Sequence, residues 1–470
     1  MKREKELVKN TIVLALGKFL PRLVTLVTLP IVTARLSKND YGTYDLIMTL
    51  VMLLMPVATL QIQSAAFRFL IDCRDDKNKC KEIITNIFGV TLFVSSIISV
   101  IFLIFVNKMN IVTRAIVVFY FIADIMYNTI SQVSRGLGKN KIYSVSAIVL
   151  SIINGFGVVI LVELFSFGLN GVILSLSFAD IVAFIFIAFS INVFQFINLK
   201  KINSERVKEM LAYSWPMVPN NLSTWVLKLS DRLVITAFLG IESNAVYAVA
   251  NKIPNLLLIA QSIFVMAWQE NASLAVNDKD AEKYYSDMFD TMFSLMIGFT
   301  GALIACTPIM FKLLIKGNYE DAYLQMPILI LGMFFYCMSA FQGGIYIAHK
   351  KTKSVGITTV VAAIINLMVD FMLINFIGIT AGSLSSLVAY LVLYIYRMWD
   401  INKIQPIRYD LKKQIIYIFI MIVMLLLCSL RNKYINVINI FVSIVVFLLV
   451  NRKLIINTLK YGSKKIHKTI

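Results

Sequence analysis

Six basic residues interrupt long apolar stretches of this sequence: Lys18, Arg22, Arg68, Lys228, Arg232 and Lys252. A charged side chain in an apolar medium costs at least about 2–3 kcal/mol, so such residues usually face a cavity and contact a ligand. Lys18 and Arg22 are four residues apart, and Lys228 and Arg232 have the same spacing. Because residues four apart lie on one face of a helix, each pair would present two cations together. We therefore predict that these six residues bind an anionic substrate.

The two cationic pairs suit a ligand that carries phosphate groups. An Arg guanidinium binds two phosphate oxygens at once, whereas a Lys ammonium acts as a mobile point charge. Counted back from a turn sequence that recurs in both halves of the chain, Arg22 lies seven residues further away than Arg232 does. Seven residues are two helical turns, about 10 Å. We expect the pairs at different depths of one cavity, where a diphosphate can pass from one to the other.

The same charges also have a structural interpretation. Asp231 adjoins Arg232 and can form a buried ion pair with it. Arg68 and Lys252 can extend along apolar surface and place their charges at the membrane interfaces. Under this interpretation only Lys18 and Arg22 lie deep in the membrane, and the two explanations predict different environments for Arg232.

Acidic and other polar residues also lie in the apolar stretches. The acids are Asp124, Glu163, Asp180, Asp231, Glu270 and Asp370. A proton-coupled or sodium-coupled transporter needs such a group, but most lie close to the end of a stretch, so we expect structural ion pairs. The candidate sugar or coupling contacts are Gln61, Asn221, Trp268, Gln269, Glu270 and Asp231. Hydrogen bonding between helices explains these polar residues equally well.

The composition identifies the medium in which these residues lie. Of 470 residues, 59% are hydrophobic and 15% are charged, and the mean hydropathy is +0.79. The apolar residues form repeated runs of about 20, the length of a membrane-spanning helix. Forty-five Lys and Arg against 26 Asp and Glu give a formal charge of +19. We attribute this excess to membrane topology and to anionic lipid headgroups, and we expect no nucleic-acid partner.

The fold class that follows is an all-α integral membrane protein with about fourteen transmembrane helices. The predicted spans are residues 10–33, 42–65, 83–106, 112–134, 142–164, 170–197, 213–239, 244–271, 288–315, 325–348, 354–376, 380–402, 411–430 and 433–451. Lys and Arg are concentrated at the N-terminus, in alternate connections and in the tail. Because cytoplasmic loops hold such residues in excess, we expect both termini in the cytoplasm.

An internal repeat indicates two lobes. ARLSKNDYGTYDL, from Ala34, resembles AFLGIESNAVYAVA, from Ala237, and KNKIYSVSAIVLSIIN resembles KTKSVGITTVVAAIIN. We predict an N-terminal lobe at 1–205, a C-terminal lobe at 206–405, and a helix pair with a basic tail at 406–470. Two pseudo-symmetric six-helix lobes around a central cationic cavity are typical of alternating-access transporters.

Cysteine and histidine give no sign of metal or catalytic chemistry. The five cysteines lack metal-ligand spacing, although Cys73 and Cys80 share one polar loop. The two histidines, His349 and His467, lie among lysines at predicted helix ends. We therefore expect no metal, no cofactor and no enzymatic activity.

Two stretches resemble the polysaccharide transporter family, the oligosaccharide flippases of O-antigen, capsule and related glycans in the multidrug/oligosaccharidyl-lipid/polysaccharide exporter superfamily. The first runs from LPIVTARLSKNDYGTYDL to a closing AFRF, and the second contains SDR, KIP and AWQE; Ala34-Arg35 departs from the more usual Arg-Leu or Arg-Phe pair. The resemblance implies a polyprenyl-diphosphate-linked oligosaccharide as substrate, moved to the outer leaflet of a bacterial cell membrane. Arg68, Arg232 and Lys252 match family positions. Glycan polymerase and glycosyltransferases are candidate partners besides membrane lipids.

Other functions remain open from the sequence. A lipid II flippase also has about fourteen helices and an arginine-bearing cavity, as the superfamily resemblance implies. A cation-coupled multidrug exporter would place acids where this chain has bases. A membrane glycan polymerase or ligase would have a large outer loop, and the spacing of the predicted spans leaves no room for one.

Overall fold

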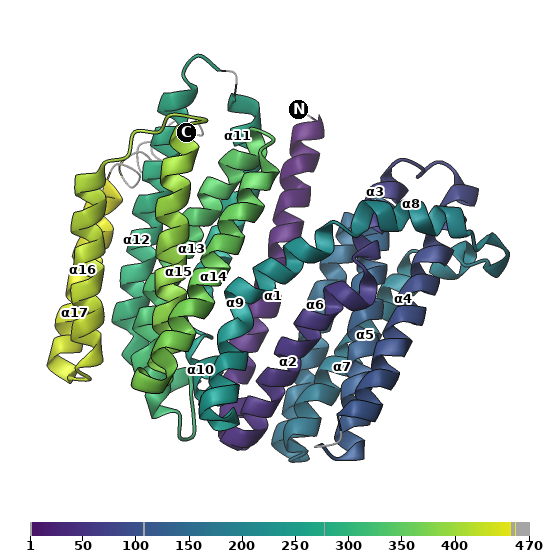
Figure 1. Ribbon diagram of the computed structural model, residues 1–470, viewed down its shortest axis with the longest axis horizontal. Helices are drawn as coiled ribbons and strands as arrows, with labels where there is room; N and C mark the ends of the chain where they lie inside the picture. Colours follow the sequence, from purple (N-terminus) through teal and green to yellow (C-terminus); the bar gives the residue numbers. More distant parts are fainter. Residues whose placement is uncertain (1, 107–108, 277, 453–455, 457–470) are drawn as a thin grey trace, which may run out of the picture. The chain divides into compact units, whose positions relative to one another are not determined.

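The computed structural model describes residues 2–106, 109–276, 278–452 and 456, and within them regular structure is helical (Figure 1). The chain forms two compact units, Met1–Trp225 and Val226–Ile470, whose boundary lies inside one helix, α9 (Met217–Leu239). This division differs from the lobes expected from the repeat, which ended at residues 205 and 405. The expected C-terminal helix pair lies in the second unit.

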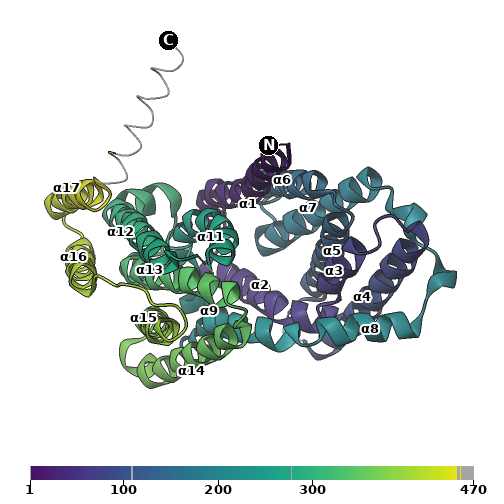
Figure 2. The same cartoon turned by 90° about the horizontal axis from the view of Figure 1, so that it is seen from above.

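The described residues of the first unit form eight complete α-helices and three short π or 3₁₀ segments. They are α1 (Lys2–Arg35), α2 (Lys38–Thr59), α3 (Ile62–Ile71), α4 (Lys77–Phe105), α5 (Ile111–Gly136), α6 (Asn140–Gly157), η1 (Val158–Leu164), α7 (Gly168–Ser190), η2 (Val193–Phe196), η3 (Leu199–Lys201) and α8 (Ser204–Ser214). Helix α7 packs against both α5 and α6, and α6 in turn packs against α1. Helix α8 crosses one end of α3 and α4, where Figure 2 shows it from above.

The second unit is built around one deeply buried helix, α13. Its helices after α9 are α10 (Ile241–Ala250), α11 (Leu256–Ala275), α12 (Ala281–Leu314), α13 (Glu320–Ala348), α14 (Thr352–Ile377), α15 (Thr380–Asn402), α16 (Leu411–Ser429) and α17 (Lys433–Val450). Helix α13 packs against α11, α12 and α15. Helices α16 and α17 pack against α12 at the edge of this unit (Figure 2).

Eleven helices in the described part of the chain are long and apolar enough to cross a membrane, which confirms the all-α membrane class. Three expected spans are not among them: residues 10–33, 213–239 and 244–271. Many side chains of 10–33 and 244–271 lie outside the described residues, and 213–239 contains Lys228, Asp231 and Arg232. The count of fourteen therefore stays a prediction.

Two of the expected spans are interrupted rather than continuous. Residues 42–65 are split between α2 and α3, because Leu60 and Gln61 adopt left-handed backbone conformations with φ of 48° and 55°. Residues 244–271 are split by a turn at 251–255 between α10 and α11, which contains Pro254, a residue without a backbone N–H to donate. Discontinuous helices in transporters free backbone groups near substrates and ions.

Helices α6 and α7 approach closely at Gly157. A Cβ added there would lie 2.7 Å from Cβ and 3.1 Å from Cα of Ser175 on α7. We expect Gly157→Ala to lower the thermal unfolding temperature of the purified protein, since overpacking a tight contact costs about 1–3 kcal/mol. Gly89 on α4 has nothing within 4 Å of such a Cβ, so Gly89→Ala is the matched control. Equal melting temperatures for both variants would contradict the close approach.

A buried arginine joins three helices of the second unit. Arg397 on α15 is 4% exposed. Its Nη1 donates to Ser339 O on α13 at 2.7 Å, and its Nε donates to Thr358 Oγ1 on α14 at 3.0 Å. Its Nη2 donates to Thr359 Oγ1 at 3.1 Å. These neutral acceptors satisfy the guanidinium, so Arg397 holds α13, α14 and α15 together.

Candidate functional site

Arg22 lies on the face of α1 that is turned away from α6. Gly17 of α1 approaches Ser144 of α6 closely, and Val24 approaches Gly155 of α6, so these two positions mark the packed face. At 100° per residue, Arg22 is about 140–160° around the helix from both. Its side chain is half-buried, and within the described residues no hydrogen bond or ion pair involves its guanidinium. A guanidinium in this state can accept an anionic ligand without breaking an existing contact.

The partner of Arg22 in the first cationic pair, Lys18, has a side chain that lies outside the described residues. The third basic candidate of the first unit, Arg68, is exposed near the end of α3. Its Nη1 contacts Asp72 Oδ1 at 2.6 Å. Among the described residues, Arg68 therefore has a carboxylate partner four residues further along the chain.

The second cationic pair lies on α9. The Lys228 side chain is exposed, and its Nζ lies 4.7 Å from the centre of the Tyr336 ring. Arg232, one turn later, is half-buried. Lys252 is half-buried in the turn between α10 and α11, so it lies at a helix interruption rather than inside a helix. The second unit thus presents two cations on one helix and a third at a break.

Asp231 lies about 60° around α9 from Lys228 and 100° from Arg232, and it points into the interior of the second unit. It is 1% exposed, and its Oδ2 accepts hydrogen bonds from Tyr247 Oη at 2.6 Å and from Ser386 Oγ at 2.7 Å. Tyr247 Oη also lies 3.2 Å from Gly382 O. Asp231 is therefore held by α10 and α15, and its hydrogen bonds are those of a positioned carboxyl group rather than of a surface ion pair.

A second carboxyl group, Asp370 on α14, belongs to the same buried cluster and was expected only as an ion-paired residue. It is fully buried, and in the described part of the chain neither of its carboxylate oxygens has a hydrogen-bond partner, nor does Oδ1 of Asp231. Asn366, one turn before Asp370, accepts from Ser230 Oγ at 3.1 Å and donates to Ser385 Oγ at 3.3 Å. The cluster therefore joins α9, α14 and α15 through oxygen-rich side chains.

This cluster needs a positive charge or a proton. A buried carboxylate without a partner is very costly, and no described ion pair involves Asp231 or Asp370. A proton, or a cation held by the carboxylate oxygens with Gly382 O, would neutralise it. Oxygen donors of this kind are those that hard cations prefer. The geometry is suited to linking ion or proton binding to the arrangement of α9.

Comparisons with known proteins agree with this architecture. The sequence pattern of polysaccharide biosynthesis proteins matches residues 7–270, which is more than half of the chain. The chain belongs to this family. The resemblance expected from the sequence is thereby confirmed, and no curated protein sequence matches the chain.

Solved structures similar to this polysaccharide biosynthesis protein are membrane transporters. The lipid II flippase MurJ in an inward closed conformation has a TM-score of 0.73 at 15% identity, with 94% of this chain and 100% of that chain covered. An inward-facing multidrug resistance MATE family transporter of the MOP superfamily has a TM-score of 0.71 at 14% identity, with 82% of this chain and 95% of that chain covered. A MOP superfamily transporter from Pyrococcus furiosus, described as having a binding pocket of reverse polarity, has a TM-score of 0.58 at 14% identity, with 84% of this chain and 95% of that chain covered. At these identities the likeness establishes the fold.

The other candidate contacts of this family member lie in different surroundings. Trp268 is 2% exposed, and its ring stacks on Phe341 at a centroid distance of 4.3 Å. Its Nε1 donates to Phe341 O at 3.0 Å, so in this conformation the indole is occupied by protein contacts. Gln61 is buried at the break before α3, where its Oε1 accepts from Ser64 Oγ at 3.3 Å. Asn221 is half-buried on α9. The side chains of Gln269 and Glu270 lie outside the described residues.

Ion pairing of the acids, which we expected from the sequence, holds for one residue. Glu163 on η1 accepts from Arg35 Nε at 2.9 Å, and both side chains are exposed. Asp124 on α5 instead accepts from Asn128 Nδ2 at 2.8 Å. For Asp231 and Asp370 no ion pair is found among the described residues, and ion pairing of these two acids stays a prediction.

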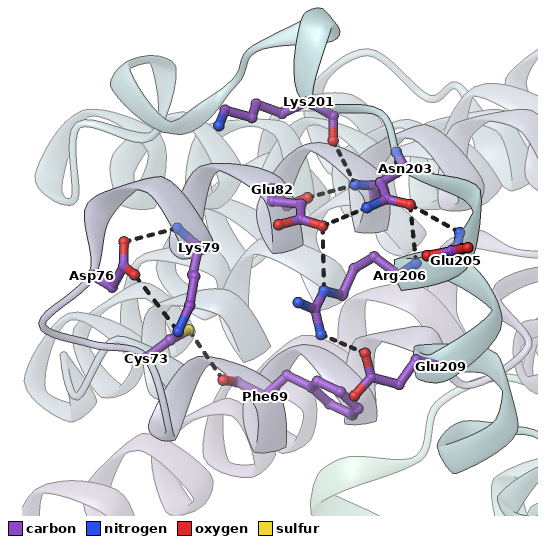
Figure 3. A network of polar contacts seen from close by, with 11 residues as sticks. Phe69, Cys73, Asp76, Lys79, Glu82, Lys201, Asn203, Glu205, Arg206 and Glu209 are labelled. Carbon is purple, nitrogen blue, oxygen red and sulfur yellow. Dashed lines mark hydrogen bonds and ion pairs between the residues drawn. The ribbon is translucent and has the colours of Figure 1, made fainter.

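The connection between the two repeats is fixed to the first unit by a polar network (Figure 3). Asn203 Nδ2 donates to Glu82 Oε1 on α4 at 3.0 Å, and Arg206 Nε on α8 lies 3.4 Å from the same oxygen. Arg206 also pairs with Glu209. Asn86 Nδ2 donates to Lys201 O at 3.0 Å. The segment before α9 is thus attached to α4, and α4 and α8 share a fixed geometry.

Two cysteines lie beside this network, at the start of α4. The Sγ atoms of Cys73 and Cys80 are 3.9 Å apart, and both side chains are buried. Burial, with the neighbouring Cys80, raises the pKa of the Cys73 thiol from 9.0 to about 12. This lowers the thiolate fraction at neutral pH about 1000-fold. We expect N-ethylmaleimide to modify Cys73 only after denaturation, as measured by mass spectrometry of the labelled peptides; rapid labelling of the folded protein would contradict the buried environment.

Proposed function

We propose that this chain is a flippase that moves a polyprenyl-diphosphate-linked oligosaccharide, a unit of O-antigen, capsule or a related surface glycan, across a bacterial cell membrane. Movement is from the cytoplasmic to the outer leaflet by alternating access, and both termini are cytoplasmic. Membership of the polysaccharide biosynthesis family and the similarity in fold to lipid II and multidrug transporters support transport rather than catalysis. No residue is assigned a catalytic role.

The observation that carries this proposal is the burial and position of the basic residues Arg22, Lys228 and Arg232. Arg22 is half-buried on the face of α1 that is turned away from α6, with no described partner, and α9 carries Lys228 and Arg232 one turn apart. Cations inside a membrane protein are retained where a ligand needs them. Each of the two units carries one of these cationic pairs, and cations of this kind bind the phosphate oxygens of a diphosphate. Lys18, Arg68 and Lys252 complete the proposed binding residues.

The proposed transport cycle uses the buried acids for coupling. Asp231 is adjacent to Arg232 but faces the interior cluster with Asp370. Binding of a proton or cation there would change the position or rotation of α9, on which Lys228 and Arg232 lie about 60° and 100° around the helix from Asp231. One helix thus connects ion binding to substrate binding, in keeping with the rocking motion of repeat-based transporters.

A gene deletion complemented with the wild-type gene tests the substrate class. We expect surface glycan to disappear in the deletion strain while the lipid-linked oligosaccharide accumulates in the cytoplasmic leaflet, and both to return to normal on complementation. If the precursor reaches the outer leaflet normally and only its polymerisation or attachment fails, the flippase proposal is wrong.

A second candidate, a lipid II flippase, is favoured by the similarity to MurJ over almost the whole of both chains. The same deletion strain distinguishes the two. A lipid II flippase would leave surface glycan synthesis intact and cause accumulation of the peptidoglycan precursor with loss of wall integrity. A multidrug exporter would change neither precursor and would alter only drug sensitivity.

A further inference from the structure

An aromatic ring lies beside one of the cations of the second unit. Lys228 is near the middle of α9, and Tyr336 is near the middle of α13. Lys228 Nζ lies 4.7 Å from the centre of the Tyr336 ring, which is the distance of a cation–π contact. A charge in the middle of a span is retained where it meets water or a polar ligand. The groups around Lys228 therefore indicate what this cation binds.

Tyr336 lies on the narrow open face of a helix that is otherwise enclosed. From Leu329 to Tyr346, every residue of α13 except Tyr336 and Ala340 is buried. These two residues are four apart and therefore share one face of the helix. Of the two, only Tyr336 has a polar side chain. The open face of α13 thus presents a single phenol group, on the side where Lys228 lies.

Packing against α15 fixes the ring of Tyr336. The centre of the Tyr390 ring lies 5.1 Å from it, and Tyr390 is 2% exposed. One turn earlier on α13, a Cβ on Gly332 would lie 3.3 Å from Cα of Leu387, so α13 and α15 are close together at this level. A ring held in this way gives the Lys228 ammonium a fixed surface. The ammonium is restrained without a carboxylate, since among the described residues no ion pair involves it.

The hydroxyl group of Tyr336 has no partner among the described residues, and it is not enclosed by protein atoms. The neighbouring Tyr390 differs, because its hydroxyl is buried and lies 3.5 Å from Leu227 O. A hydroxyl group left without a partner in an apolar layer is costly, so water or a ligand must complete it. Tyr336 therefore adds one O–H donor beside the three N–H donors of Lys228.

We propose that Tyr336 and Lys228 together hold one phosphate group of the lipid-linked substrate. The hydroxyl group of Tyr336 donates to one phosphate oxygen and the ammonium of Lys228 to another, while the ring keeps the ammonium in place. Phosphate suits this pair because it is anionic and accepts several hydrogen bonds through separate oxygens. A cationic ligand would be repelled by Lys228. This inference rests on the proposed flippase function and adds to it a binding residue, Tyr336.

Binding of undecaprenyl diphosphate to the purified full-length protein tests the proposal, with dissociation constants measured by native mass spectrometry. We expect Tyr336→Phe, which keeps the ring, to bind about tenfold more weakly, the factor given by one hydrogen bond to a charged group. Tyr336→Leu also removes the ring and should lose about a further threefold. Lys228→Met should lose about tenfold or more. In the double variant with Tyr336→Phe the two losses should not add fully, because both groups hold one phosphate.

Tyr396 on α15 provides the matched control, because it is 38% exposed and Tyr396→Phe removes the same hydroxyl group from another surface of the unit. This variant should bind like the wild type. Tyr336→Phe should keep the wild-type unfolding temperature, since it removes no described hydrogen bond. Wild-type affinity in Tyr336→Phe would overturn the proposal and leave the flippase function in place. A wild-type protein that does not bind undecaprenyl diphosphate would overturn both.

Phosphatidylglycerol, used in place of undecaprenyl diphosphate, identifies the source of the phosphate group. We expect the wild type to bind it about tenfold more weakly, because a phosphodiester has fewer anionic oxygens than a diphosphate. Tyr336→Phe should change that affinity by less than about twofold. Equal binding of the two lipids by the wild type, with equal losses in Tyr336→Phe, would overturn the assignment to the substrate in favour of a site for phospholipid headgroups.

Discussion

Replacing Arg22 and Arg232 together with alanine is expected to reduce transfer of lipid-linked oligosaccharide to the outer leaflet by about 100-fold or more. Each charge-assisted hydrogen bond to a phosphate contributes about 1.5–3 kcal/mol, and 1.4 kcal/mol is a factor of ten. Each single variant should therefore lose about tenfold or more. The measurement is surface glycan and cytoplasmic-leaflet precursor in the complemented deletion strain, with the membrane level of each variant determined by immunoblot.

Two further variants separate substrate binding from folding and from total charge. Arg431 is exposed and pairs with Glu320 at 3.9 Å, so Arg431→Ala removes the same side chain outside the proposed site. Arg232→Lys keeps the charge but loses bidentate geometry, and it should retain part of the activity. Wild-type transport by the double alanine variant, present at normal levels, would remove Arg22 and Arg232 from the binding site.

The membrane fold could be predicted from the sequence because composition alone determines it. Runs of about 20 apolar residues in a chain with 59% hydrophobic residues leave helices as the only structure that satisfies the backbone in lipid. The basic pair Lys228 and Arg232 could also be found, since spacing by four residues fixes their shared helix face. Arg22 shows how far such reasoning extends: its helix was predicted, but its orientation away from α6 required knowledge of where Gly17 and Val24 make contact.

The interruption between α2 and α3 could not be predicted, because its cause is not local. Leu60 and Gln61 have no sequence signal for a left-handed backbone, and Pro56 lies four residues earlier inside α2. Leu60 O accepts a hydrogen bond from Ser214 Oγ at 2.9 Å, a residue far along the chain. Such tertiary contacts compensate for the lost helical hydrogen bonds, and only the structure shows them.

The cluster of Asp231 and Asp370 could not be predicted for a similar reason. Asp231 was interpreted together with its sequence neighbour Arg232, but successive residues on a helix point about 100° apart. Asp370 and Ser386 come from α14 and α15, and nothing in their local sequences indicates that they meet Asp231. Buried polar residues of a helix can be recognised from sequence, but their partners cannot.

Asp370→Asn is expected to leave the protein folded while reducing transport about tenfold or more and removing its dependence on a proton or sodium gradient. Replacing a buried, unpartnered carboxyl group by a neutral amide removes a charge that the interior must otherwise neutralise, so the unfolding temperature should stay the same or rise. Coupling should be lost because an amide neither binds a proton at neutral pH nor provides the charge that holds a cation. The measurement is transfer of the lipid-linked oligosaccharide in proteoliposomes with an imposed pH or sodium gradient.

Asp231→Asn should have the same effect on coupling, since both carboxyl groups belong to one cluster, and the double variant should be no worse than either single one. Glu163→Gln is the matched control, because Glu163 forms an exposed pair with Arg35 outside the cluster. A variant of Asp370 that is more stable, transports at the wild-type rate and still responds to the gradient would show that the cluster only positions helices. If the gradient dependence disappears in both cluster variants and persists in Glu163→Gln, then the buried cluster of Asp231 and Asp370 is where the driving ion acts.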